Sequence, residues 1–133
     1  MKHFLDTGPL VALLNRRDPH HAWATDTLRC LRWPLFTCEP VLTEATHLLG
    51  DAAPVLELVE AGDLVVEFSA SDHASEILRL LRQFSDRDMG LADACLVRMT
   101  EVWRDSLVLT IDRQDFQVYR RRGREPVPFL APP

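Results

Sequence analysis

Short apolar runs alternate along the chain with longer stretches in which apolar residues recur every three or four positions. The short runs predict strands, and the stretches with helical spacing predict helices. We expect strands at 3–5, 35–38, 64–68, 107–111 and 127–130, and helices at 10–15, 20–32, 41–49, 54–62, 74–84, 91–102 and 114–121. Strands that alternate with helices predict an α/β fold around a mostly parallel sheet of about five strands.

Single residues predict where some helices begin or end and which face they bury. Thr7, with a proline two residues later, suits the N-cap of the first helix. Gly50 suits the end of the helix at 41–49. The helix at 74–84 carries an apolar stripe that we expect to be buried, made of Ala74, Ile77, Leu78, Leu81 and Phe84. Pro128 lacks a backbone N–H, so the last strand is expected at an edge of the sheet.

Length and composition fit one ordinary domain. The chain has 133 residues, of which 47% are hydrophobic and 26% charged, and no repeat or flexible linker divides it. We therefore expect a single domain over 1–133, with a core that needs no disulfides. Asp6 interrupts the first apolar stretch, which argues against a secretory signal, and no apolar run is long enough to cross a bilayer.

The three cysteines, Cys30, Cys38 and Cys95, form no CxxC pair. This scattered, odd set favours reduced thiols in a cytoplasmic protein over a disulfide framework or a cysteine-rich zinc site. Cys30 and Cys95 fall in predicted helices, where we expect both to be buried.

The net charge of −5 at first argues against a nucleic-acid partner. The distribution of the charge changes that view, because four carboxylates bound to cations would account for most of the net negative charge. Arginines also cluster at 120–122 and 124 and at 79 and 82. They are either a basic rim around an acidic site or an ordinary solvated surface.

Two predicted strands each deliver an aspartate near their carboxyl end. Asp6 follows the first apolar run, and Asp112 follows the run at 107–111. Parallel sheets place their sites at this edge, where the strand order reverses. Either aspartate alone could simply cap a helix, but two in matching positions favour a shared site.

Two further acids lie on predicted helices among apolar neighbours. Glu44 shares a stripe with Val41 and Leu48, so we expect its carboxylate to point toward the interior. The alternative is a glutamate at the edge of the stripe that reaches solvent. Asp93 lies in the first turn of its helix, beside Leu96 and Val97 on the same side, where the helix dipole also favours a negative charge.

Four ionised carboxylates at one place would repel one another unless some protonate or cations bind. Hard oxygen ligands suit Mg²⁺ or Mn²⁺ rather than zinc. Such ions hold a phosphodiester, activate water and stabilise the leaving oxygen, so no cysteine or serine nucleophile is needed.

Four segments in order resemble the signature segments of PIN domains, and their spacing is most similar to VapC-type toxins of bacterial toxin–antitoxin pairs. The segments are LDTGPLVALLN, VLTEATHLL, LADACLV and TIDRQDF, and the resemblance runs from Lys2 to about Phe129. It implies a Rossmann-like three-layer sandwich with Mg²⁺- or Mn²⁺-dependent endoribonuclease activity, a hydrolase acting on RNA.

The resemblance also implies roles for particular residues. The family's acidic positions match Asp6, Glu44, Asp93 and Asp112, with Asp115 as an auxiliary acid that contacts metal through water. Thr7 and Thr110 flank these acids and are candidates to hydrogen-bond them. The family further implies a homodimer and a cognate antitoxin protein whose tail occupies the site.

Several alternatives stay open. Asp86 or Asp88, just upstream of Asp93, could substitute as a ligand. A PIN-fold RNA-processing nuclease without an antitoxin and a catalytically idle PIN-fold interaction module are both consistent with the segments. Leu5–Gly8 also resembles the motif of aspartic proteases, but those are all-β proteins, and helices dominate here. A haloacid-dehalogenase-like enzyme would need an aspartate where Gly8 stands.

Overall fold

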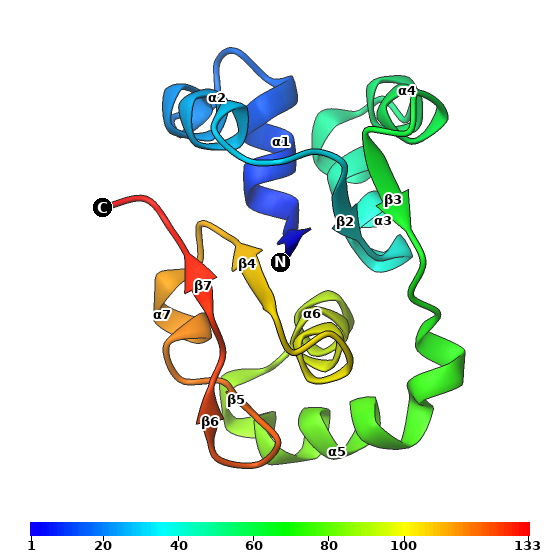
Figure 1. Ribbon diagram of the computed structural model, residues 1–133, viewed down its shortest axis with the longest axis vertical. Helices are drawn as coiled ribbons and strands as arrows, with labels where there is room; N and C mark the ends of the chain where they lie inside the picture. Colours follow the sequence, from blue (N-terminus) through cyan, green and yellow to red (C-terminus); the bar gives the residue numbers. More distant parts are fainter.

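A five-stranded sheet with every neighbouring pair parallel forms the centre of the computed structural model, which describes residues 1–133 (Figure 1). The strands lie in the order β3-β2-β1-β4-β7. They are β1 (Lys2–Leu5), β2 (Leu35–Thr37), β3 (Leu64–Val66), β4 (Ser106–Leu109) and β7 (Phe129–Leu130). The predicted α/β class and five-stranded sheet are confirmed, and β7 lies at an edge, as Pro128 predicts.

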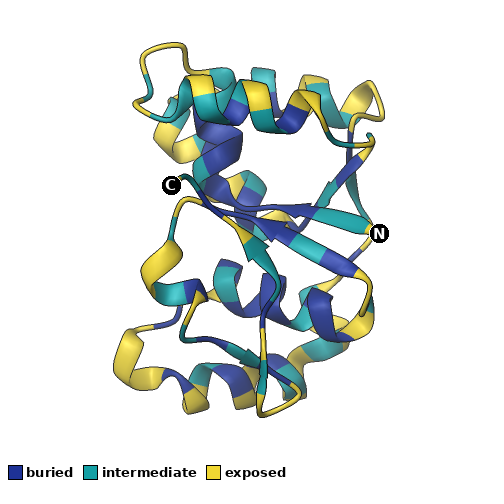
Figure 2. Ribbon diagram, turned by 60° about the vertical axis from the view of Figure 1, so that its left-hand side comes forward, coloured by how far each residue is buried: buried dark blue, intermediate teal, exposed yellow.

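Helices cover both faces of this sheet (Figure 2). They are α1 (Thr7–Leu14), α2 (His21–Arg29), α3 (Glu39–Leu49), α4 (Ala53–Glu60), α5 (Ala74–Gln83), α6 (Leu91–Val102) and α7 (Arg113–Phe116), with 3-10 turns at Ala70–His73 and Ser85–Arg87. Helix α1 packs against α2 and α3, and α5 packs against α6 on the other side of the sheet. One cluster of 27 buried residues joins the layers. The longest helix has 12 residues, and no helix has the length and apolar character needed to span a membrane.

The chain changes direction across the sheet at β1. From β1 it builds outward through β2 to β3, and it then crosses back to add β4 and β7 on the other side. Leu5 pairs with Leu109, and the backbone N–H of Asp6 donates to the carbonyl oxygen of Leu109 over 2.9 Å. The segments that leave β1 and β4 therefore start side by side, at the position where open α/β sheets hold their ligands.

Three details of the predicted elements are wrong. Helix α1 begins at Thr7, and Asp6 is its N-cap, because the Asp6 carboxylate accepts from the N–H of Thr7 while the hydroxyl of Thr7 donates to Glu44. Helix α7 ends at Phe116 instead of near 121. Arg120–Arg121 (β5) instead pairs antiparallel with Glu125–Pro126 (β6), across a turn in which Gly123 has a φ of 83°.

The third difference is the face that α5 buries. Ile77, Leu80 and Phe84 point inward, at i, i+3 and i+7, whereas Ala74 and Leu78 of the predicted stripe are exposed. The choice depends on the direction from which α6 packs, which helical periodicity alone does not specify. Cys30 is exposed as well, because α2 ends at Arg29, whereas Cys95 is buried as expected.

Candidate functional site

Asp6 lies at the carboxyl end of β1 and is only 7% exposed. Its Oδ1 accepts from the N–H of Thr7 over 2.7 Å, and its Oδ2 accepts from the hydroxyl of Thr110 over 2.7 Å. Burial raises the pKa of Asp6 to about 6 although these two hydrogen bonds lower it, and the charges of Glu44 and Asp112 raise it further. Asp6 is thus both a helix cap and a buried, costly charge beside other acids.

Asp112 is the N-cap of α7, three residues after β4. Its Oδ1 accepts from the N–H of Asp115 over 3.1 Å, and its own N–H donates to the hydroxyl oxygen of Thr110 over 3.0 Å. Thr110 therefore links Asp6 and Asp112 through a single hydroxyl. Burial raises the pKa of the Asp112 carboxyl above its ordinary value. Asp6 and Asp112 therefore each cap a helix and also lie next to each other, so the two alternatives for these aspartates hold together.

Asp93 approaches the same place from the first turn of α6. Its Oδ2 accepts from the hydroxyl of Tyr119 over 2.7 Å. Burial raises the pKa of Asp93 to about 7, the charge of Asp6 raises it further, and the Tyr119 hydrogen bond lowers it. The ring of Tyr119 is fully buried and packs edge-on against Phe84 and Phe116.

Sequence reasoning missed Tyr119. The available signal was weak: it is the only tyrosine of the chain, and a buried tyrosine hydroxyl needs a hydrogen-bond partner. Nothing local in the sequence identifies Asp93, 26 residues away, as that partner.

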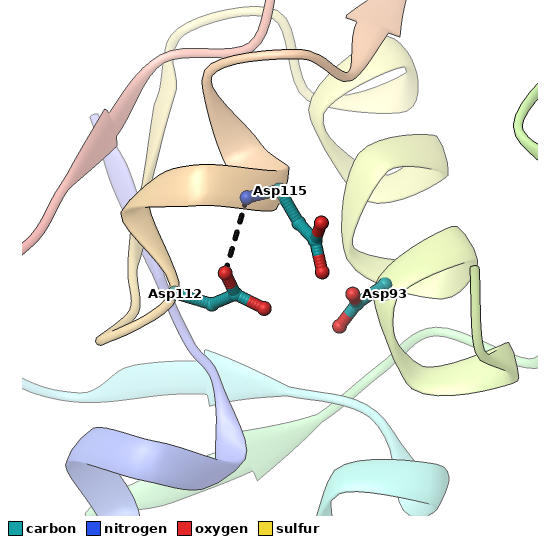
Figure 3. Close-up of side chains that lie close together, drawn as sticks. All are labelled: Asp93, Asp112 and Asp115. Carbon is teal, nitrogen blue, oxygen red and sulfur yellow. Dashed lines mark hydrogen bonds between the residues drawn. The ribbon is translucent and has the colours of Figure 1, made fainter. Parts of the chain in front are cut away.

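Asp115 completes a compact group with Asp93 and Asp112. Each of these three aspartates offers a carboxylate oxygen within 4.8 Å of the others. Figure 3 shows the three carboxylates turned toward the space between α6 and α7. Asp115 also forms an ion pair with Arg87, whose Nη2 lies 3.0 Å from Oδ1. Asp86 and Asp88, the alternative ligands, are exposed and are not part of this group.

Glu44 lies on α3, and its predicted orientation is wrong. Helix α3 buries Val41 and Ala45, while Glu44 is exposed and Leu48 is 64% exposed, so the expected stripe is not the buried face. The hydroxyl of Thr7 nevertheless donates to Oε1 of Glu44 over 2.9 Å. Glu44 thus borders the site without belonging to the close group of three.

The donor set fits a hard divalent cation. Each member of the group of three offers a carboxylate oxygen, and no histidine or cysteine belongs to it. Buried carboxylates are costly unless a cation or hydrogen bonds compensate them. Arg87 is the only basic side chain that forms an ion pair with any of Asp6, Glu44, Asp93, Asp112 and Asp115.

A groove of about 740 Å³ has Glu44 in its lining and so borders the candidate site. Glu39, Glu44 and Glu67 are among its lining residues, and Ala92 connects it to Asp93. Through Leu91 it continues into a shallower trough of about 400 Å³ along α5, whose lining is almost entirely apolar and includes the exposed Leu78. The groove is therefore acidic at one end and apolar at the other.

Comparison of the chain with known proteins points to one family. The family model described as PIN domain matches residues 3–121. Ribonuclease VapC26 of Mycobacterium tuberculosis is 25% identical over 125 residues, which cover 90% of this chain and 93% of that protein.

Proposed function

Because the chain belongs to the PIN domain family, we propose that it is a metal-dependent endoribonuclease that hydrolyses RNA phosphodiester bonds. The observation that carries this proposal is the convergence of Asp6, Asp93, Asp112 and Asp115 at the carboxyl ends of β1 and β4, with one arginine to balance them. The similarity to a protein named as a ribonuclease supports RNA as the substrate.

Asp6, Asp93 and Asp112, together with Glu44, are the proposed catalytic and metal-binding residues, and Asp115 is the auxiliary ligand. These residues would hold Mg²⁺ or Mn²⁺, which supplies positive charge toward the phosphate oxygens and acidity toward the attacking water. The chain itself prepares the ligands, since Thr110 orients Asp6 and the cap of α7 orients Asp112. Glu44 stands at the exposed border, where a carboxylate held by Thr7 can accept a proton from water.

Cleavage of labelled RNA by Asp6→Asn and Asp93→Asn variants tests this proposal. Both substitutions keep the shape of the side chain but remove a negative charge, and we expect cleavage to fall by about 100-fold or more. Asp26→Asn, on the exposed surface of α2, is the matched control and should cleave like the wild type. EDTA should abolish cleavage, and Mn²⁺ should restore it.

Equal cleavage by all four proteins, insensitive to EDTA, would remove the nuclease proposal. A wild-type chain that cuts no RNA with either metal would leave the idle interaction module as the better description.

We further propose that the nuclease is the toxin of a type II toxin–antitoxin pair. An acidic groove end beside the catalytic acids and an apolar trough along α5 would accept a protein segment with basic and apolar side chains. Expression of the chain should stop growth, and co-expression with the protein encoded immediately upstream should relieve this arrest. Growth arrest that no neighbouring gene product relieves would favour an RNA-processing nuclease without an antitoxin.

The remaining assignments are proposals of the same kind. We treat 1–133 as a single PIN domain, since β7 adds a strand to the sheet after the matched residues end. The three free cysteines support a cytoplasmic location. We also propose a homodimer, as the family resemblance implies, and light scattering of the purified chain would measure it.

A further inference from the structure

Arg87 combines a fixed backbone with an exposed side chain next to the acids. It ends the 3-10 turn between α5 and α6, and its N–H donates to the carbonyl oxygen of Phe84 over 3.0 Å. Phe84 is buried, and so is Met89 just after the turn. The turn is therefore anchored in the core, while the arginine side chain stays 34% exposed.

The guanidinium group is only partly engaged. Nε and Nη2 both lie near the same oxygen, Oδ1 of Asp115, at 3.1 and 3.0 Å, and Nη2 also donates to the carbonyl oxygen of Gln114 over 3.4 Å. Nη1 has no hydrogen-bond partner in the chain. Arginine pairs most strongly when its fork meets two oxygens of one anion, so this arrangement leaves donors available for a second anionic group.

Charge balance indicates what that group is. A phosphodiester that approaches the acids meets several negative charges, and Arg87 is the basic side chain that forms an ion pair with one of them. We propose that Arg87 binds a phosphate of the RNA next to the scissile one, and that Asp115 holds the guanidinium in place until RNA arrives. This inference rests on the proposed nuclease function.

The shared carboxylate creates competition between Arg87 and the cation. Asp115 belongs both to the ion pair and to the group of three acids. An ion pair with Arg87 therefore weakens the attraction of the acids for a divalent cation, although the same arginine assists RNA binding. Loss of Arg87 should change the two affinities in opposite directions, which a purely structural role would not do.

Arg87→Gln and Arg87→Lys test the inference, with Arg32→Gln as a matched control. Arg32 is exposed and precedes β2, so it lies at the amino edge of the sheet, opposite to the acids. Four quantities are measured on the full chain: Mn²⁺ affinity by calorimetry without RNA, KM and kcat for a single-stranded RNA, and the dependence of KM on salt.

For Arg87→Gln we expect Mn²⁺ to bind about 3- to 10-fold more tightly, because a nearby positive charge is gone. KM should rise about 10-fold with a smaller change in kcat, as for a contact made equally in ground and transition states. The slope of log KM against log salt should decrease by about 0.7, the value for one phosphate contact on a single strand. Arg87→Lys should keep the wild-type salt slope, because the positive charge remains. Its KM should lie between those of wild type and Arg87→Gln, because the two-pronged guanidinium group is lost.

Two outcomes would overturn the inference. If Arg87→Gln equals wild type and Arg32→Gln in KM, salt slope and Mn²⁺ affinity, Arg87 contacts no phosphate. If Mn²⁺ and RNA both bind more weakly, Arg87 is only a clamp between the α5–α6 turn and α7. Wild-type protein that cuts no RNA would instead reject the nuclease proposal itself, and this inference with it.

Discussion

The hydroxyl of Tyr119 donates a 2.7 Å hydrogen bond to Oδ2 of Asp93, and it does so from inside the hydrophobic core. Because Phe84 and Phe116 pack against the ring, the hydroxyl cannot swing away from the carboxylate. One oxygen of Asp93 is thereby held, and the carboxylate stays in the group it forms with Asp112 and Asp115.

Tyr119→Phe should weaken metal binding without unfolding the chain. The substitution keeps the ring packing and removes only the hydrogen bond that lowers the pKa of Asp93. Loss of such an orienting partner typically costs about 10-fold or more in metal affinity. We expect that loss in a Mn²⁺ titration near pH 7, and a smaller deficit at pH 8.5, where Asp93 is ionised in both proteins.

Ser106→Ala is the matched control for Tyr119→Phe. Its hydroxyl is also buried but has no hydrogen-bond partner, and it lies at the amino end of β4, away from the acids. Its removal should leave Mn²⁺ affinity unchanged. Unchanged Mn²⁺ affinity in Tyr119→Phe as well would mean that Tyr119 only fills space.

Thr110→Val should loosen both strand-end aspartates at once. The change removes the donor to Asp6 and the acceptor for the N–H of Asp112 while preserving a branched side chain. We expect the free energy of unfolding to fall by about 1–3 kcal/mol, because buried polar groups lose their partners. Thr110→Ser keeps the hydroxyl and should recover most of the Mn²⁺ affinity and RNA cleavage that Thr110→Val loses. Equal behaviour of the two variants would contradict the bridging role.

The metal-free protein should become less stable as the pH rises from about 4 to 7. The folded-state pKa values of Asp6 and Asp93 are raised to about 6 and about 7 from an ordinary value of 3.8. Folding thus favours their protonated forms. Their stabilisation is fully present below about pH 4, decreases as the pH rises, and is gone above about pH 6 for Asp6 and about pH 7 for Asp93. Urea unfolding with EDTA should show this loss, which is on the order of a few kcal/mol.

Mn²⁺ should reverse the effect at pH 8, by about 2.7 kcal/mol at a hundred times its dissociation constant. Asp93→Asn, which cannot ionise, should show a shallower loss between pH 4 and 7, whereas Asp26→Asn should follow the wild type. If the free energy of unfolding of the metal-free wild type does not change with pH in this range, the pKa values of Asp6 and Asp93 are not raised by burial, and the prediction fails.

Gly8→Ala tests the tight contact between α1 and the segment after β4. A Cβ atom at position 8 would lie 2.8 Å from Cδ1 of Ile111 and closer still to its Cγ1. Ile111 is 40% exposed and can turn outward, so we expect a destabilisation of only about 1 kcal/mol. It stands between Thr110 and Asp112, however, so cleavage should fall several-fold. Ile111→Ala combined with Gly8→Ala should restore cleavage, and a double variant as poor as Gly8→Ala would place the effect elsewhere.

The hydrophobic pattern alone was enough for the architecture and for part of the site. Apolar runs between amphipathic stretches specify an alternating α/β chain, because strands buried on both faces must be apolar throughout. An aspartate directly after such a run, as Asp6 is, has to emerge at the carboxyl edge of the sheet. The position of Asp112 after β4 follows from the same reasoning. Both positions could be predicted because each aspartate is placed by the strand that directly precedes it in the chain.

Only the packing of distant segments decided the rest. Whether Glu44 or Leu78 faces the core depends on which neighbour covers the helix, and a stripe of apolar residues does not specify that direction. Tyr119 meets Asp93, and Arg87 meets Asp115, across 26 and 28 residues of chain. Such contacts arise when whole helices dock against one sheet, since hydrogen bonds between remote side chains leave no periodic trace in the sequence.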